Sequence, residues 1–318
     1  MAQLLVSGAN GFVGSKLCYS AKEKQYSVKA AVRSVDSHLN ISADALIVGD
    51  IGPDTDWSSA LQGVDVIIHL AARVHVMKEA SKYPLAEYRR VNVDGTRNLA
   101  LAAAKAGVKR FVFVSTIKVN GESTLEKPFT EEDIPAPRDP YAVSKWEAEE
   151  VLKDISSRTG LEVVVLRPPL VYGPGVKGNM LALMKYIDKG YPLPFGKINN
   201  KRSFISLDNL VDTLLASAAA PQCAGKTFLV SDGCALSTSD LVKRIAGAMN
   251  KKTNLINIPE GLFSILGMIV PPLRPVVDRL TDSLVVDSSL FNRVTGWSPI
   301  QSVEEGIEGM VSEYLRNK

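Results

Sequence analysis

The chain has 318 residues, of which 46% are hydrophobic and 22% are charged, and its formal net charge is +3. This length favours one large domain or two interleaved domains around a sizeable core. The small charge, with both signs mixed along the chain, gives no basis for nucleic-acid binding. The three cysteines have no regular spacing, so they indicate neither a disulfide framework nor a metal site, and they fit a reducing compartment.

Two further features bear on location. The start of the chain shows neither the basic segment nor the cleavage site of a secretory signal. The longest apolar run, 262–273, contains two prolines and is shorter than the roughly 20 residues of a membrane-spanning helix. We therefore expect a cytoplasmic protein without a transmembrane segment. The apolar run is interpreted as a buried or lid segment near the substrate, with contact to a membrane surface as the alternative.

The first half of the sequence alternates short apolar runs with longer helical stretches. Strands are predicted at 3–7, 28–33, 45–49, 64–70, 110–115 and 162–167, and helices from the first turn to about 24, at 84–106 and at 140–157. The strand runs are continuously apolar, which is typical of strands buried on both faces of a parallel sheet. Repeated strand–helix–strand units therefore predict an α/β fold with a doubly wound parallel sheet, the Rossmann fold.

Beyond residue 167 the composition changes, because proline and glycine become frequent. One more strand at 226–231 and a C-terminal helix at 302–316 are predicted there. We interpret this part as a smaller C-terminal substrate-binding domain. Some of this part of the chain is expected to return to the large sheet. The expected division places 1–170 and about 204–231 in the dinucleotide-binding domain, and 171–203 and 232–318 in the substrate domain.

A glycine-rich turn joins the first strand to the first helix. Its glycines, Gly8, Gly11 and Gly14, are spaced G-x-x-G-x-x-G. Glycines let the backbone turn tightly and let a pyrophosphate approach the helix N-terminus, where free N–H groups and the helix dipole favour anions. The turn therefore predicts a dinucleotide site. Its expected residues are Gly8, Asn10, Gly11, Phe12, Val13 and Gly14.

The ends of the second and third strands bear on the choice of dinucleotide. The second strand ends in Arg33, with no acid before Asp36. An arginine here can accommodate the extra phosphate of NADP, although it can also stack on the adenine. The cofactor is therefore expected to be NAD or NADP, and Arg33 leans toward NADP. Asp50, followed by Ile51, could accept a hydrogen bond from the adenine amino group or could be a simple loop aspartate.

Tyr141 and Lys145 lie four residues apart on a predicted helix, so they share one face. An ammonium beside a phenol lowers a pKa that is normally near 10, and such a tyrosine can exchange a proton with a substrate hydroxyl while a hydride moves. The lysine could also bind the nicotinamide ribose. This spacing alone is not specific, since Tyr314 and Lys318 share it. The supporting feature is Thr116, which follows a strand at the ligand edge and could hydrogen-bond the reacting oxygen.

These residues together resemble the extended short-chain dehydrogenase/reductase family, in its branch of nucleotide-sugar epimerases, dehydratases and reductases. The resemblance covers nearly the whole chain and is closest to the UDP-glucose 4-epimerase type. Beyond the glycine turn and the triad Thr116, Tyr141 and Lys145, it rests on the motifs at 69–72, 91–98, 167–175 and 295–299. It implies further cofactor contacts. These are Leu70, Ala71, Ala72, Asn92 and Pro168, together with Tyr141 and Lys145 of the triad.

The resemblance also extends to the substrate. It implies a nucleotide sugar, UDP-linked, with Asn179 at the pyrophosphate, Phe195 on the uracil side, and Arg202 and Arg279 at the phosphates. Arg274 is the weaker candidate for the second arginine. Two arginines and an amide suit a diphosphate well. The same resemblance implies no metal, a role in cell-surface polysaccharide biosynthesis, and a homodimer formed through the helices near 84–106 and 140–157.

Three departures from the family pattern bear on the reaction. Dehydratases of this branch carry Asp-Glu directly after the catalytic threonine, where this chain has Ile117 and Lys118. Dehydration is therefore not expected. Epimerases of the UDP-galactose type usually have a tyrosine where Asn120 stands, and often an asparagine where Leu170 stands.

The leading interpretation is an NAD(P)-dependent nucleoside-diphosphate-sugar 4-epimerase that works through a transient 4-keto sugar, with Tyr141 as acid and base. The alternative is an NAD(P)H-dependent reductase of a nucleotide 4-keto-6-deoxy-sugar, which Arg33, Asn120 and Leu170 favour.

Two other functions carry less weight. A reductase of an unrelated small ketone would have no use for the residues expected at the diphosphate. A dinucleotide-sensing protein without enzymatic activity would be expected to lack the acid–base pair, which this chain keeps.

Overall fold

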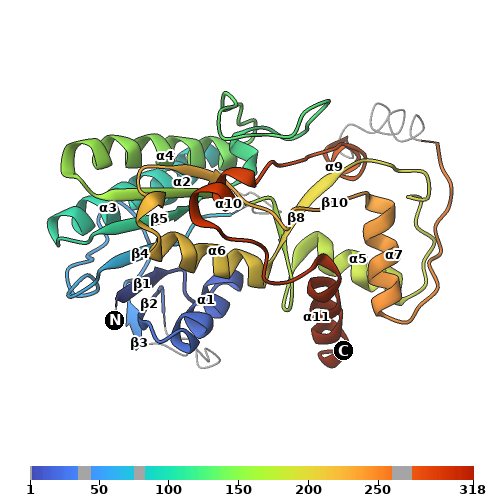
Figure 1. Cartoon of the computed structure of the whole chain (residues 1–318), viewed down its shortest axis with the longest axis horizontal. Helices are drawn as coiled ribbons and strands as arrows, with labels where there is room; N and C mark the ends of the chain where they lie inside the picture. The colour runs from blue at the N-terminus through green and yellow to red at the C-terminus, as the bar shows by residue number, and fades with distance from the viewer. Residues whose placement is uncertain (1, 35–43, 75–82, 260–273) are drawn as a thin grey trace.

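The protein is described by a computed structural model that covers residues 2–34, 44–74, 83–259 and 274–318. Seven parallel strands form one sheet, and helices cover both of its faces (Figure 1). The strands are β1 (Gln3–Ser7), β2 (Ser27–Val32), β3 (Asp44–Ile47), β4 (Val66–His69), β5 (Arg110–Val114), β6 (Glu162–Arg167) and β9 (Thr227–Leu229). Their order is β3-β2-β1-β4-β5-β6-β9, which confirms the predicted doubly wound sheet. The topological switch point, where such folds bind ligands, therefore lies between the carboxyl ends of β1 and β4.

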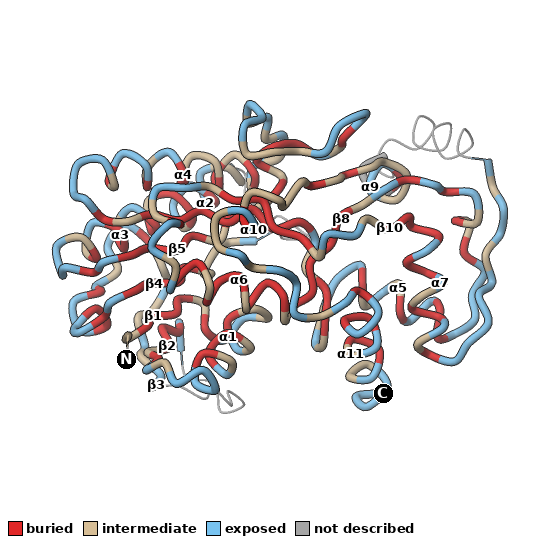
Figure 2. The backbone as a smooth tube through the Cα atoms, in the orientation of Figure 1, coloured by how far each residue is buried: buried red, intermediate tan, exposed pale blue. Residues whose placement is uncertain are grey.

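The central strands are buried over most of their length (Figure 2), because they separate two cores. In β1, Leu4 and Val6 face one core while Leu5, between them, faces the other. A strand covered on both faces has no solvent side, so no polar alternation is needed. The first core is closed by α1 (Phe12–Glu23) and α6 (Leu207–Ala219), and the second by α3 (Gly95–Lys105) and α4 (Pro140–Thr159).

The predicted strand ends agree with the structure to within two residues. The helix predicted at 84–106 is interrupted, however. It consists of α2 (Pro84–Arg89), a π-helical turn at Arg90–Asp94, and α3. A π-helical turn widens the helix locally and is frequent at functional sites. The apolar pattern of the sequence does not predict this π-helical turn. The turn places Asn92 in the interior of the protein.

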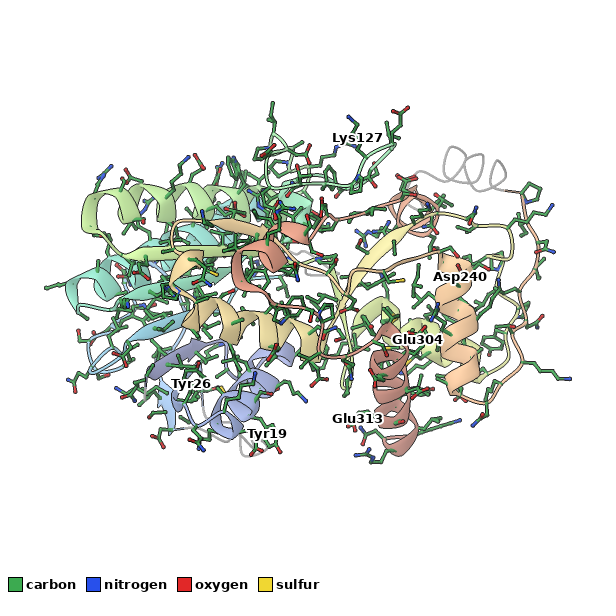
Figure 3. All side chains as sticks on the ribbon, viewed as in Figure 1. Tyr19, Tyr26, Lys127, Asp240, Glu304 and Glu313 are labelled. Carbon is green, nitrogen blue, oxygen red and sulfur yellow. The ribbon has the colours of Figure 1, made fainter. Side chains whose placement is uncertain are left out.

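A second, three-stranded sheet was not predicted. It is formed by β10 (Ala235–Leu236), β8 (Arg202–Ser206) and β7 (Leu170–Tyr172). β10 and β7 have only 2 and 3 residues, too few for a periodic signal, and β8 runs directly into α6. Beside it, α5 (Gly178–Asp188), α7 (Thr238–Ala248) and α11 (Val303–Arg316) enclose a core of their own. Arg244 of α7 forms an ion pair with Glu304 of α11 (Figure 3).

The expected domain division stays a prediction, since its boundaries after 170 and 203 fall within β7 and β8. Two further helices, α9 (Arg274–Thr281) and α10 (Ser289–Thr295), precede α11. Among the described residues, no helix has the length and apolar character needed to cross a membrane. The apolar run 262–273 lies outside the described residues.

His69 connects the elements that meet at the switch point. It is buried at the end of β4, and its ring nitrogens lie 2.6 Å from Ser7 Oγ at the end of β1 and 3.0 Å from Thr96 Oγ1 on α3. The ring also stacks on Phe113 of β5. Burial, together with the charge of Lys145, lowers the pKa of His69 to about 3. The imidazole is therefore neutral in the folded protein.

This lowered pKa predicts sensitivity to acid. Between pH 6.5 and about 3 the unfolded chain binds a proton at His69 that the folded protein does not, so acid favours unfolding. We expect this residue alone to remove about 1.4 kcal/mol of unfolding free energy per pH unit below pH 6.5. Denaturant unfolding between pH 7 and pH 4.5 should show that His69→Gln loses less unfolding free energy per pH unit than the wild type does. As a control, Ile245→Val in the smaller core should destabilise by the same amount at every pH. Equal slopes in the wild type and His69→Gln would contradict the prediction.

Candidate active site

The glycine turn brings three backbone segments into direct contact. Gly8 has a φ of +70°, and a Cβ there would lie 2.9 Å from the backbone nitrogen of Ala71 after β4. A Cβ on Gly14 would lie 2.1 Å from the carbonyl oxygen of Gly8. Gly11 is the N-cap of α1 and makes no side-chain hydrogen bond to the first turn. The turn therefore forms a cradle without side chains at a helix N-terminus, which suits a pyrophosphate.

Asn92 joins the segment after β4 to the helix that carries Tyr141. Its amide donates to the Arg73 carbonyl (3.0 Å) and to Ser144 Oγ (2.9 Å), and its oxygen accepts from the Arg73 backbone N–H (2.7 Å). Ser144 in turn donates to the Tyr141 carbonyl at 2.7 Å. Asn92 thus fixes the position of Ala71–Arg73 relative to α4. Its direct contact with a cofactor stays a prediction, as does that of Leu70 and Ala72.

Arg33 and Asp50 follow β2 and β3 and lie side by side. Arg33 Nε is 3.6 Å from Asp50 Oδ1, and the two side chains are 75% and 73% exposed. Ion pairs this exposed contribute little to stability, so either group can turn to a ligand at low cost. The predicted adenosine-side residues are therefore neighbours beyond the carboxyl ends of β2 and β3.

Tyr141 and Lys145 are placed by the start of α4. Asp139 caps this helix, its Oδ1 accepting from the Ala142 N–H at 2.7 Å, and Pro140 occupies the first turn as predicted. Lys145 follows one turn later and is only 2% exposed, with Nζ 3.8 Å from the centre of the Phe113 ring. Burial lowers the pKa of Lys145 to about 7, against the opposing charge of Glu149.

The environment of Tyr141 differs from the expectation. A neighbouring lysine was expected to lower the pKa of the phenol, but burial raises it above 10, and the charge of Asp139 adds to the effect. The Tyr88 ring packs edge-on against Tyr141 at 6.3 Å. Without a cationic ligand the phenol is therefore held protonated. A burial penalty of this kind depends on the tertiary surroundings and leaves no trace in the spacing of Tyr141 and Lys145.

Thr116 lies where β5 ends. It is the N-cap of a short 3₁₀ helix, and its Oγ1 accepts a 3.3 Å hydrogen bond from the Lys118 N–H. The next residue, Ile117, donates its backbone N–H to the Pro168 carbonyl at 3.0 Å. The strand ends of β5 and β6 are therefore linked, and Thr116 and the predicted cofactor contact Pro168 lie at the same edge of the sheet.

A buried polar network supports these catalytic elements. Arg167 at the end of β6 pairs with Glu149 on α4, with a shortest N–O distance of 2.6 Å. Glu149 also accepts from the hydroxyl of Ser115, the residue before Thr116. Arg167 Nη1 donates to Asn120 Oδ1 (2.9 Å), and the Asn120 amide donates to the Thr130 carbonyl (2.9 Å).

This network was not predicted from the sequence. Asn120 was noted only as a departure from the epimerase pattern, and Glu149 was not singled out. A signal was available, because Glu149 continues the four-residue series of Tyr141 and Lys145 along one helix face.

The predicted substrate residues come from four separate elements. Asn179 is exposed in the first turn of α5, and Phe195 is buried in the smaller core. Arg202 begins β8 and donates to the Asp282 carbonyl at 2.9 Å, while Arg279 is exposed on α9. Burial lowers the pKa of Arg202; the charge of Asp282 opposes this shift, and the charge of Arg279 adds to it. Arg202 and Arg279 therefore lie close enough for their charges to interact.

The side chain of Arg274 lies outside the described residues. Within the described part of the chain, no group of three or more His, Cys, Asp or Glu side chains is placed to hold a metal ion.

Comparisons with known proteins agree with this arrangement. Residues 4–230 match the NAD dependent epimerase/dehydratase family. The chain belongs to this family. Its members are enzymes of the short-chain dehydrogenase/reductase type, so the protein is an enzyme of this type.

Two relatives illustrate the similarity. A UDP-glucose 4-epimerase from Vibrio cholerae is 44% identical, with 98% of this chain and 95% of the relative covered. A UDP-glucose 4-epimerase from Mycolicibacterium smegmatis is 30% identical, with 99% and 98% covered.

Solved structures share the fold over their full length. The UDP-glucuronic acid 4-epimerase from Bacillus cereus, in complex with NAD, superposes with a TM-score of 0.79 at 22% identity, covering 99% of each chain. The UDP-N-acetylglucosamine 4-epimerase from Bacillus cereus gives 0.80 at 22% identity, covering 100% of each chain. At this level of identity the likeness concerns the fold alone.

The buried Lys145 of this family member predicts an unusual pH dependence of stability. Between pH 7 and 10.5 the unfolded chain carries a proton on this lysine that the folded, cofactor-free protein lacks. The stability of the protein therefore rises with pH across that interval. Lys145→Met should stabilise the cofactor-free protein by about 2 to 4 kcal/mol at pH 7, and the gain should shrink toward pH 10.

Denaturant unfolding of cofactor-free protein at pH 7 and pH 9.5 measures this difference. Lys153→Met, on the exposed face of the same helix, is the matched control and should show no such trend. A Lys145→Met protein less stable than the wild type at pH 7 would contradict the burial penalty.

Proposed function

We propose that the protein is an NAD-dependent 4-epimerase of a UDP-linked sugar. The observation that carries the proposal is the placement of Thr116 and of the pair Tyr141 and Lys145 at the ligand edge of the sheet, beside the glycine cradle. The Vibrio cholerae relative, which is named a UDP-glucose 4-epimerase, supports the choice of reaction and of the uridine nucleotide.

In this reaction Tyr141 takes the proton of the sugar C4 hydroxyl, and Thr116 hydrogen-bonds the same oxygen. The cradle of Gly8 to Gly14 would hold NAD, which would supply a hydride acceptor and donor for the sugar C4. Tyr141 then gives the proton back to the C4 oxygen. The raised pKa of Tyr141 keeps this proton in place until positive charge is supplied near the phenol. A protonated Lys145 supplies part of that charge.

Arg202, Arg279 and Asn179 are proposed to hold the diphosphate. Arginine binds such groups through paired hydrogen bonds, and the mutual repulsion of the two guanidinium groups strengthens their preference for an anion between them. The sugar ring is then free to turn about its link to the diphosphate between the two hydride transfers. A site that anchors the nucleotide and leaves the sugar mobile suits epimerisation.

We also infer a homodimer formed through α3 and α4. Leu101 of α3 is 50% exposed and lines a hollow together with Val151 and Ile155 of α4. The charged side chains of Arg97, Glu150, Asp154 and Arg158 line the same hollow. An apolar centre among charged groups on two adjacent helices is the kind of surface that a two-fold copy can cover.

Replacing the proposed acid–base group should separate catalysis from binding. Tyr141→Phe is expected to lower the rate of UDP-glucose epimerisation by a factor of about 10² to 10⁴. NAD should stay bound, because only the hydroxyl is removed and the ring can still pack against Tyr88. The matched control is Tyr314→Phe, which has the same Tyr-x-x-x-Lys spacing but a hydroxyl that donates to Asp188 at 3.1 Å. Turnover that survives in Tyr141→Phe would remove Tyr141 from the mechanism.

The cofactor content of the freshly purified protein tests the reaction class. An epimerase must keep its reduced cofactor between half-reactions, so we expect near-stoichiometric NAD, released by denaturation and identified by mass spectrometry. The protein should then convert UDP-glucose to UDP-galactose with no cofactor added. Protein that arrives empty, binds NADPH reversibly and loses this binding in Arg33→Gln would instead support a keto-sugar reductase that uses NADP.

A further inference from the structure

Lys118 contacts both elements that carry the proposed catalytic groups. Its backbone N–H donates to Thr116 Oγ1 at 3.3 Å. Its ammonium forms an ion pair with Asp139 Oδ2 and lies 3.6 Å from Glu122 Oε1. The side chains of Lys118 and Asp139 are 29% and 27% exposed, so this pair is partly sheltered from solvent.

The partner of Lys118 has a second function. Asp139 precedes Tyr141 by two residues. Its other carboxylate oxygen caps α4 by accepting a hydrogen bond from the Ala142 N–H. The cap that starts the catalytic helix therefore places a negative charge beside the phenol. This charge raises the pKa of Tyr141, in addition to burial, and so opposes the ionisation that a general base requires.

We propose that Lys118 is a positioning residue of the active site, which orients the Thr116 hydroxyl through its backbone and neutralises Asp139 through its ammonium. The inference rests on the proposed role of Tyr141 as acid and base. Because Lys118 neutralises Asp139, Asp139 can cap α4 while raising the pKa of Tyr141 by less. A carboxylate at position 118 would face Asp139 with like charge and would have the opposite effect.

The other groups around Tyr141 do not replace this function. Tyr88 of α2 packs edge-on against Tyr141 and itself adds to the raised pKa of Tyr141. The Arg73 guanidinium lies 5.5 Å from the centre of the Tyr88 ring. Lys145 on α4 has its pKa lowered by burial, so its positive charge is only partly present near pH 7. Glu122 is acidic and pairs with Lys118 itself. The ammonium of Lys118 is bonded directly to the cap.

Four proteins form the test: the wild type, Lys118→Met, Asp139→Asn and the double variant. Asparagine is as good an N-cap as aspartate, so Asp139→Asn removes the charge and keeps the helix start. Lys118→Arg is the conservative control. The primary readout needs no substrate: the phenolate absorbance of Tyr141 is titrated in the NAD complex, as the difference between each protein and its Tyr141→Phe counterpart.

Lys118→Met should raise the midpoint of this titration by about 0.5 to 1 pH unit, and Asp139→Asn should lower it. The double variant should return close to the wild type, because Lys118 acts on Tyr141 through Asp139, and Lys118→Arg should match the wild type. The rate of sugar oxidation in Lys118→Met should fall about three- to tenfold at neutral pH and recover at higher pH. A rate lowered equally at every pH would show a purely structural role.

An unmoved titration midpoint in Lys118→Met overturns the inference, whatever the substrate. A wild type that fails to epimerise UDP-glucose and forms no reduced cofactor overturns the proposed function instead. The two failures are distinguishable because the titration uses only the protein and NAD.

Discussion

The active site depends on one buried ion pair, between Glu149 of α4 and Arg167 of β6. A buried pair of this kind gains little net stability, because removing two charges from water is costly. Its geometry is nevertheless complete, since Ser115 donates to the carboxylate and Asn120 accepts from the guanidinium. The pair therefore fixes the catalytic helix against the ends of two strands. The position of Thr116 relative to the helix that carries Tyr141 and Lys145 depends on that attachment.

Burial disfavours the charged forms of three ionisable side chains: His69 at the switch point and the proposed catalytic groups Tyr141 and Lys145. Burial keeps His69 unprotonated, brings Lys145 to a pKa of about 7, and keeps Tyr141 protonated. Such a site is poised for a ligand that brings positive charge, because an added cation favours the phenolate. Oxidised nicotinamide bound at the glycine cradle would supply such a charge.

Sequence patterns predicted the large sheet because burial on both faces leaves a continuous apolar run, as in Leu4 to Val6. They also predicted the glycine turn and the helix that begins at Pro140, since each is decided by local backbone chemistry. The three-stranded sheet was missed because strands as short as Ala235–Leu236 exist only through pairing with distant residues. The Glu149 network and the direction of the Tyr141 pKa shift were missed for the same reason, as both depend on which groups the fold encloses.

An epimerase places a stricter demand on its acid–base residue than a one-way reductase does. The same tyrosine must take a proton in the first half-reaction and return it in the second, so neither protonation state can be strongly favoured. Burial and Asp139 favour the phenol, while Lys145 and the bound nicotinamide favour the phenolate. Lys118 acts on this balance from outside, since it cancels the charge of the helix cap without approaching the substrate oxygen. The departure from the dehydratase pattern at position 118 is therefore consistent with a reversible proton transfer at C4.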